Sequence, residues 1–255
     1  MIKQHIPIKA LLAALTLLGA GGAQAQLAFN GSYQQNFDVL GADTSWLDGW
    51  SGVNTAVSPS TPLTLGITTG TTTSGGIYNV GSAGSTDRAL GSLAGGTVIP
   101  RFGVQFQNTS GAAFTDIQMS GVMEQWRSGS SATVNEALTF EYSFDAQDID
   151  DSTATWHSLA GLDLWERLTD STSGGAVDGN LLENQNLVSG TISDAMWLDQ
   201  GLLTMRWTDF NDTGSDGLYA LDNFSMTGIS SVPEPSVWAL VGIGLLALLT
   251  RPLRR

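Results

Sequence analysis

The strict alternation of residues over 138–144 limits most sharply what this chain can fold into. Every second residue from Leu138 to Phe144 is apolar or aromatic, and the residues between them are polar. In an extended strand, successive side chains point to opposite faces, so this pattern predicts a strand with one buried and one solvated face.

Comparable β-rich runs recur along the chain and are separated by turn residues such as those in Asp178-Gly179-Asn180. Further expected strands span residues 101–107, 114–124, 202–207 and 219–227. No long helical repeat of apolar residues interrupts them. Short strands at turn-bounded intervals are typical of a sandwich, so we expect an all-β, jelly-roll-like antiparallel β-sandwich in one domain over residues 26–231.

Several short segments resemble the jelly-roll modules of bacterial surface proteins, and Leu221–Ser225 is similar to the last strand of lectin-like and MAM-like sandwiches. The other segments that carry this resemblance are residues 88–92, 102–104, 124–127 and 206–209. It implies the fold and names no ligand.

Residues 1–25 have the order of a secretory signal peptide. Lys3 and Lys9 precede a short apolar run, and Ala23 and Ala25 occupy the −3 and −1 positions of a cleavage site after Ala25. We expect export through the inner membrane.

The chain's last segment, residues 232–255, combines three features. Val232, Pro233, Glu234 and Pro235 lead into an apolar stretch over about 236–250, and Arg251, Arg254 and Arg255 close the chain. A fifteen-residue helix measures about 22 Å, short against a hydrocarbon core of about 30 Å, yet able to span it with thinning and snorkelling. We expect a single transmembrane helix with its arginine tip on the cytoplasmic side.

This combination resembles a PEP-CTERM sorting signal, found in Gram-negative bacteria that make exopolysaccharide. The resemblance implies processing near the motif by an exosortase-type enzyme. The protein would be membrane-anchored first and then passed to the cell surface or extracellular matrix.

Charge and cysteine content exclude some classes of protein. Between Lys9 and Arg251 there are five arginines, no lysine and 24 acidic residues, a net charge of −19. Such a body repels phosphate backbones, so no nucleic-acid partner is expected. The absence of cysteine rules out disulfides and thiolate metal sites.

Catalytic motifs are missing. His157 is the only histidine after the signal peptide, and neither a Gly-x-Ser-x-Gly elbow nor a His-Glu-x-x-His pair occurs. Carboxylate pairs can hydrolyse glycosides, but no spacing selects a pair among Glu124, Glu136, Glu141, Glu166 and Glu183. The prediction is that the chain is not an enzyme.

The segment 209–217 is a candidate Ca²⁺ loop, because Asp209, Asn211, Asp212 and Asp216 place side-chain oxygens at alternate or near-alternate positions of a glycine-containing loop. It is not an EF-hand, since Ala220 stands where a bidentate glutamate is required. A solvated turn explains the same residues, and explains still better a second acidic loop at Asp145–Asp151.

Tryptophans are candidate carbohydrate platforms. Most are expected in the core, while Trp46 and Trp50 stand among loop residues and are expected to be the most exposed. Together these features predict a non-enzymatic cell-surface or matrix protein whose sandwich mediates adhesion or exopolysaccharide association. A secreted carbohydrate-active enzyme and a coat protein without a defined ligand are the alternatives.

Overall fold

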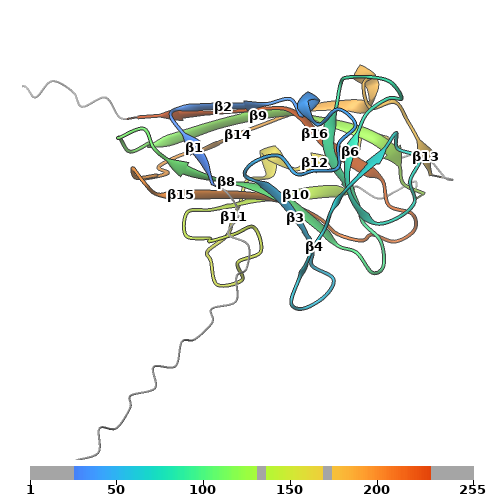
Figure 1. Ribbon diagram of the computed structural model, residues 1–255, viewed down its shortest axis with the longest axis horizontal. Coiled ribbons are helices and arrows are strands. Elements are labelled where there is room, and N and C mark those ends of the chain that lie inside the picture. Colours follow the sequence, from blue (N-terminus) through green and yellow to red (C-terminus); the bar gives the residue numbers. More distant parts are fainter. Residues whose placement is uncertain (1–25, 131–135, 169–173, 231–255) are drawn as a thin grey trace, which may run out of the picture.

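The computed structural model describes residues 26–130, 136–168 and 174–230. These residues form two eight-stranded sheets that pack face to face (Figure 1). Sheet A contains β1 (Leu27–Phe29), β3 (Trp50–Asn54), β4 (Thr61–Pro62), β8 (Pro100–Asn108), β10 (Ala137–Ser143), β11 (His157–Ser158), β12 (Leu164–Trp165) and β15 (Leu202–Asp209). Sheet B contains β2 (Ser32–Gln35), β5 (Leu65–Thr68), β6 (Gly76–Val80), β7 (Ala89–Leu93), β9 (Asp116–Ser128), β13 (Gly175–Ala176), β14 (Gln185–Ile192) and β16 (Leu218–Ile229).

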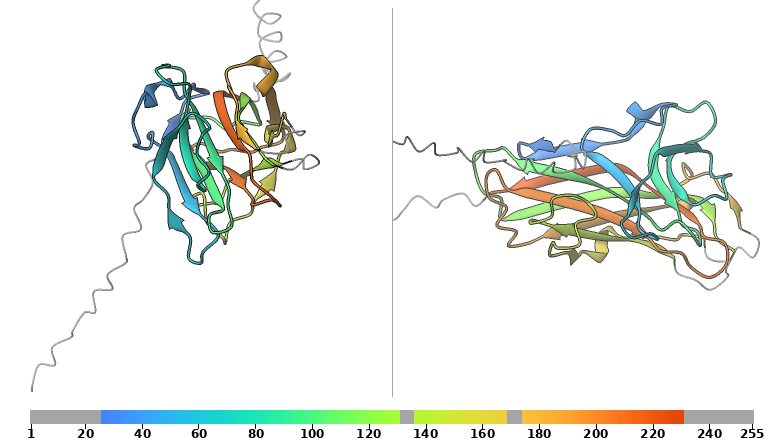
Figure 2. Two further views of the ribbon diagram at one scale, coloured as in Figure 1. Left: turned by 90° about the vertical axis from the view of Figure 1, so that its right-hand side faces the viewer. Right: turned by 60° about the horizontal axis from the view of Figure 1, so that its bottom comes forward.

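The predicted two-sheet antiparallel sandwich is confirmed. The main path of sheet A runs β11-β10-β15-β8-β3-β4, and that of sheet B runs β13-β9-β16-β7-β6-β5. Among the described strands, β1–β8 and β5–β6 pair in parallel and all other pairs are antiparallel. Because the long strands from β7 to β10 and from β14 to β16 alternate between the sheets, each connection crosses from one layer to the other (Figure 2).

The five strands expected from alternation are all present as β8, β9, β10, β15 and β16. Within the described residues, three short 3-10 helices join the strands: η1 (Asp38–Leu40), η2 (Ala160–Leu162) and η3 (Leu182–Asn184). Across the described parts of the chain, none of the helical segments has the length and apolar character needed to cross a membrane. The expected signal peptide, its cleavage site and the segment 232–255 lie outside the described residues.

Aromatic rings from both sheets fill the space between the layers. Trp207 of β15 stacks on Trp50 and Phe102 from sheet A, with ring centroids 6.2 Å and 5.7 Å away. It also meets Phe224 of sheet B edge-on at 5.9 Å. Burial of such large rings is a main source of stability, and here it ties the two sheets together.

The outer face of sheet A is covered, although alternation predicted a solvated face. On β15, Thr204, Arg206 and Thr208 point away from the core and are nevertheless buried. The connection between β10 and β11, residues 144–156, lies across them, because Gln105 and Thr204 both donate hydrogen bonds to the Ala146 carbonyl. This covering connection shapes the candidate site below.

Candidate functional site

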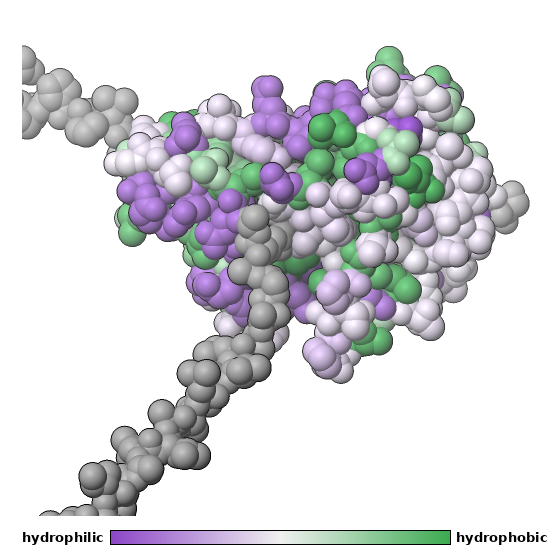
Figure 3. Space-filling model, in the orientation of Figure 1, coloured by the Kyte–Doolittle hydropathy of each residue, from purple (hydrophilic) through white to green (hydrophobic). Residues whose placement is uncertain are grey.

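A hollow of ≈570 Å³ opens on the outside of sheet A, between two connections. We call it the loop groove. Its walls are the β3–β4 connection and the β10–β11 connection, and its floor is formed by β8 and β15; the lining residues are Thr55, Val57, Ser58, Pro59, Ser60, Arg101, Asp150, Asp151, Ser152, Trp156 and Arg206. In the space-filling view the β3–β4 connection stands out below the sheets (Figure 3).

Trp156 is the aromatic side chain of the loop groove. The guanidinium carbon of Arg206 lies 3.5 Å from its ring centroid, which is a cation–π contact. The indole Nε1 donates to the Asp151 carbonyl at 2.9 Å. The ring is therefore fixed on one face and at its polar edge, and it is only half-buried.

Arg206 is held in turn by sheet A. Its Nε and Nη2 both donate to Glu141 Oε2, at 2.9 and 2.7 Å, and its Nη1 donates to the Ile149 carbonyl. Glu141 and Arg206 face each other across the β10–β15 pair, so the strand register itself sets this ion pair.

Arg101 provides a second planar cation on the floor. Its Nη1 donates to Asp150 Oδ1 at 2.6 Å and its Nε donates to Thr208 Oγ1 at 2.9 Å. The pair is partly exposed to the groove, so both side chains can also meet a bound molecule.

Two aspartates of the β10–β11 connection accept hydrogen bonds that hold this wall of the groove together. Asp151 accepts hydrogen bonds from Thr153 and from the Gln147 amide, and Asp145 accepts from Ser143 and the Thr155 amide. The second acidic loop of the sequence is therefore a set of self-bonded turns. These bonds lower the pKa of both carboxyls. The largest cause is the bond from the Thr153 side chain at Asp151 and the bond from the Ser143 side chain at Asp145.

The carboxylates at the groove are suited to binding. Asp150 and Glu141 are paired with arginines, and the pKa of Asp151 is lowered, whereas a general acid needs a carboxyl with a raised pKa. His157 is exposed on β11 and stacks on Tyr142 with ring centroids 5.3 Å apart.

The expected exposure of Trp50 is wrong. Trp50 is 2% exposed, since it begins β3 and its ring packs in the core, where its Nε1 donates to the Tyr33 hydroxyl. Trp46 is half-buried, with its Nε1 bonded to the Leu63 carbonyl. Neither residue lines the loop groove. Trp156, which sequence reasoning did not single out, takes that position.

A second cluster lies where β10 begins and the 209–217 segment ends. One carboxylate oxygen from each of Glu136, Asp212 and Asp216 lies within 4.8 Å of the others. Glu136 and Asp216 are buried. This acidic cluster could hold a metal ion, because hard cations prefer such grouped carboxylate oxygens.

Burial and neighbouring negative charges raise the pKa values of carboxyls in and beside the acidic cluster. Burial raises the pKa of Glu136, and the neighbouring Asp216 raises it further, while hydrogen bonds from the Gly217 amide and the Tyr219 hydroxyl oppose the rise. Burial, and then the charge of Glu136, raise the pKa of Glu166 to about 7. Bound protons or a cation would relieve this repulsion.

Two of the four predicted Ca²⁺ ligands, Asp212 and Asp216, belong to this cluster. Asp209 lies outside the acidic cluster. It is buried on β15 and accepts a hydrogen bond from Ser92. Asn211 is exposed and also lies outside the acidic cluster. Glu136 was missed because it is distant in sequence and only the fold brings it to the loop.

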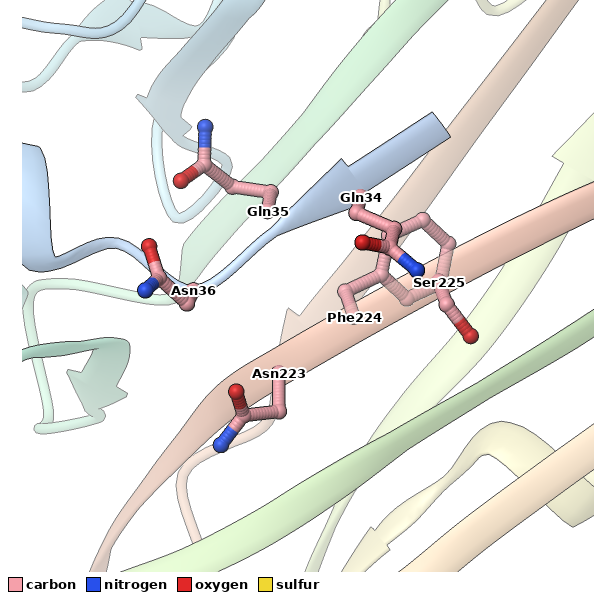
Figure 4. Close-up of a pocket in the computed structure, with 6 residues that line it drawn as sticks. All are labelled: Gln34, Gln35, Asn36, Asn223, Phe224 and Ser225. Carbon is pink, nitrogen blue, oxygen red and sulfur yellow. The ribbon is translucent and has the colours of Figure 1, made fainter. Parts of the chain in front are cut away.

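Another hollow, of ≈550 Å³, lies on sheet B beside the end of β2. Figure 4 shows the amides of Gln34, Gln35, Asn36 and Asn223 fanning out around it. Phe224 also lines it, but its ring is buried in the core. Without an exposed ring, this hollow is the weaker candidate for a sugar.

Comparisons with known proteins name no family. No family model matches the chain, and no curated protein matches it. The resemblance of residues 232–255 to a PEP-CTERM signal therefore stays a prediction.

Solved structures give distant similarities. The CBM22-1 xylan-binding domain of Paenibacillus barcinonensis Xyn10C is 12% identical over 78% of this chain and 95% of that one, with a TM-score of 0.35. The xylan-binding module CBM15 is 12% identical over 80% and 100%, with a TM-score of 0.35. A cleaved adhesin domain of Lys-gingipain from Porphyromonas gingivalis w83 is 12% identical over 71% and 93%, with a TM-score of 0.42. Similarity at this level assigns no ligand and no activity.

Proposed function

We propose that this chain is an exported, non-catalytic envelope protein whose sandwich binds polysaccharide in the loop groove. The observation that carries the proposal is Trp156, fixed by Arg206 and Asp151 and lining an open hollow among polar side chains. Binding sites of this kind combine an aromatic surface with a few well-placed polar groups.

The groups around Trp156 suit a sugar. The apolar C–H face of a pyranose packs on an aromatic ring, while its hydroxyls need both donors and acceptors. Arg101 supplies donors, and Asp150 and the hydroxyls of Ser58, Ser60 and Ser152 supply acceptors. Because the side chains at Arg101 and Arg206 are already paired, they lose little freedom on binding.

The route to the surface is part of the proposal. Residues 1–25 would direct export, and residues 232–255 would anchor the protein until an exosortase-type enzyme processes it. A polysaccharide-binding body then holds the protein in the exopolysaccharide of the cell surface or extracellular matrix. A coat protein without a ligand is the alternative if no glycan binds.

A glycan array with residues 26–231 tests the proposal. We expect selective binding without turnover, and a loss of about tenfold or more in affinity for Trp156→Ala. Trp165→Ala is the matched control, because Trp165 is exposed on β12 and lies outside the groove.

Val57→Asp places a charge in the groove without disturbing the Trp156 contacts, since Val57 is exposed on the opposite wall. It should weaken binding as well. Silence across the array, or full binding by both groove variants, would rule out polysaccharide recognition at this site; turnover of a bound glycan would favour the enzyme alternative.

The acidic cluster supports a second proposal, that Ca²⁺ binds at Glu136, Asp212 and Asp216 and stabilises this end of the sandwich. The ion would neutralise carboxylates that burial and proximity hold close together.

A further inference from the structure

One end of the sandwich gathers the last residues of β16 and the β14–β15 connection, residues 193–201. The Thr115 amide donates to the Ile229 carbonyl at 2.8 Å, and the Ala195 amide donates to the Thr115 carbonyl at 2.7 Å. Thr115 thus lies between the two, which places Ala195 about 10 Å or less from the point where the described chain ends.

This connection has a fixed shape. Trp197 is buried and stacks on Phe29, and its backbone exchanges two hydrogen bonds with Phe114. Asp194, Met196 and Gln200 hold positive φ values of 53°, 48° and 63°, which only well-determined surroundings maintain in residues other than glycine.

Two apolar side chains flank the buried tryptophan and point outward. Met196 is 69% exposed and Leu198 is 58% exposed. Since Trp197 fills the core, the residues on either side of it are held on the surface. The nearby Ile229 is also partly exposed, so this end presents apolar groups beside the departing chain.

The sequence beyond this end restricts how far the body can move from it. Only the five residues Ser231–Pro235 separate Ser230 from the apolar stretch 236–250. Five extended residues span at most about 17 Å. A bilayer that holds residues 236–250 would therefore lie close to Met196 and Leu198.

We propose that Met196 and Leu198 dock this end of the sandwich on the surface of the lipid bilayer while the chain is anchored. The inference rests on the proposed insertion of residues 236–250. Asp194 and Asp199 stand beside the two apolar residues, so docking favours zwitterionic over anionic lipid. The loop groove lies on the outside of sheet A, whereas β16, which leads into the anchor, belongs to sheet B, so docking of this end leaves the groove open to glycan.

The absence of cysteine allows a direct test with residues 26–255 in phosphatidylcholine vesicles. Met196→Cys carries an environment-sensitive fluorophore, and lipids labelled near the headgroup carry a quencher. Leu182→Cys is the matched control, because Leu182 is 84% exposed on η3 at the far end of β14 (Figure 1). Leu198→Cys provides a second docking position if the Met196 variant folds poorly.

We expect quenching at position 196 or 198 to be about threefold stronger than at 182, and weaker in vesicles with anionic lipid. Equal quenching at 196, 198 and 182 in chains that float with the vesicles overturns the docking and leaves the anchor intact. A blue-shifted but unquenched probe indicates that residues 236–250 fold back on the loop, and also overturns it. Chains that do not float refute the anchor and the docking together.

Discussion

The guanidinium of Arg206 lies over the indole ring of Trp156, with its carbon 3.5 Å from the ring centroid. The same guanidinium bonds Glu141 on the neighbouring strand and the Ile149 carbonyl of the covering connection. One buried side chain therefore links sheet A, the connection laid on it and the aromatic ring of the loop groove.

Arg206→Met should lower the free energy of unfolding by about 2–3 kcal/mol. The variant keeps the buried aliphatic stem but leaves Glu141 without its cation and Ile149 without a donor; because Glu141 is partly exposed, the loss is smaller than for a fully buried pair. Urea unfolding measures it. Arg167→Met, at an exposed arginine, is the control and should change stability by less than about 1 kcal/mol.

Gly103→Ala should destabilise the sandwich by about 3 kcal/mol and weaken glycan binding. A Cβ at Gly103 would lie 2.1 Å from the Met205 carbonyl oxygen and 3.0 Å from Ile149 Cγ2, so it would push β15 and the covering connection outward. Thermal unfolding and glycan titration check both effects. Gly96→Ala is the control and should hardly change stability, because no atom lies within 4 Å of the added Cβ. An equally small effect at Gly103 would mean that β15 and the covering connection do not need the missing Cβ.

Alternation predicted the strands well because it depends only on neighbours in sequence. Leu203, Met205 and Trp207 enter the core as their spacing requires. Coverage of the opposite face is different, since it depends on the 144–156 connection and on the missing Cβ of Gly103. The local pattern carries no sign of either.

The residues of the candidate sites likewise divide into those that lie close in sequence and those that only the fold brings together. Asp212 and Asp216 share one loop, so their sequence proximity sufficed to join them, whereas Glu136 reaches them through the start of β10. Trp50 was misplaced because its polar neighbours predict a loop, yet the strand begins at that residue. Trp156 gains its role only from Arg206, fifty positions away.

Calcium at 1 mM should raise the melting temperature by about 5–10 °C at pH 8 if the acidic cluster binds it with a Kd of about 10 μM. Glu136→Gln should remove most of this shift and still fold, because the amide oxygen can accept the bonds from Gly217 and Tyr219. Glu183→Gln, at an exposed carboxylate, should retain it. No response of the unaltered chain to calcium would eliminate the cation proposal.

The same shift should shrink at pH 5. Burial raises the pKa of Glu136 and Asp216, so protons compete with the cation in mildly acidic solution. Differential scanning fluorimetry at the two pH values measures the difference. A calcium response that is equal at pH 5 and pH 8 would place the ion elsewhere.

Glu124 should make the sandwich less stable as the pH rises from 5 to 8. It is buried on β9, where its oxygens accept hydrogen bonds from Trp126 and Gln185, and burial raises its pKa to about 8 from a usual 4.5. In this window the folded chain keeps a proton that the unfolded chain has released. The contribution of this group to stability is therefore greatest below about pH 4.5, falls as the pH rises, and is fully lost above about pH 8.

Glu124→Gln isolates that contribution, because an uncharged amide of similar shape cannot titrate. The Gln185 amide, which also donates to the Gly179 carbonyl, gives up one bond in the variant, and this cost is the same at both pH values. The unaltered chain should lose roughly 3 kcal/mol of unfolding free energy between pH 5 and 8 through this residue, and the variant should lose correspondingly less. Asp145 and Asp151 do not obscure the comparison, since their lowered pKa values act only below about pH 4. Urea unfolding at both pH values measures this loss. An equal loss of unfolding free energy between pH 5 and 8 in the two proteins would mean that Glu124 is ionised in the folded state at neutral pH.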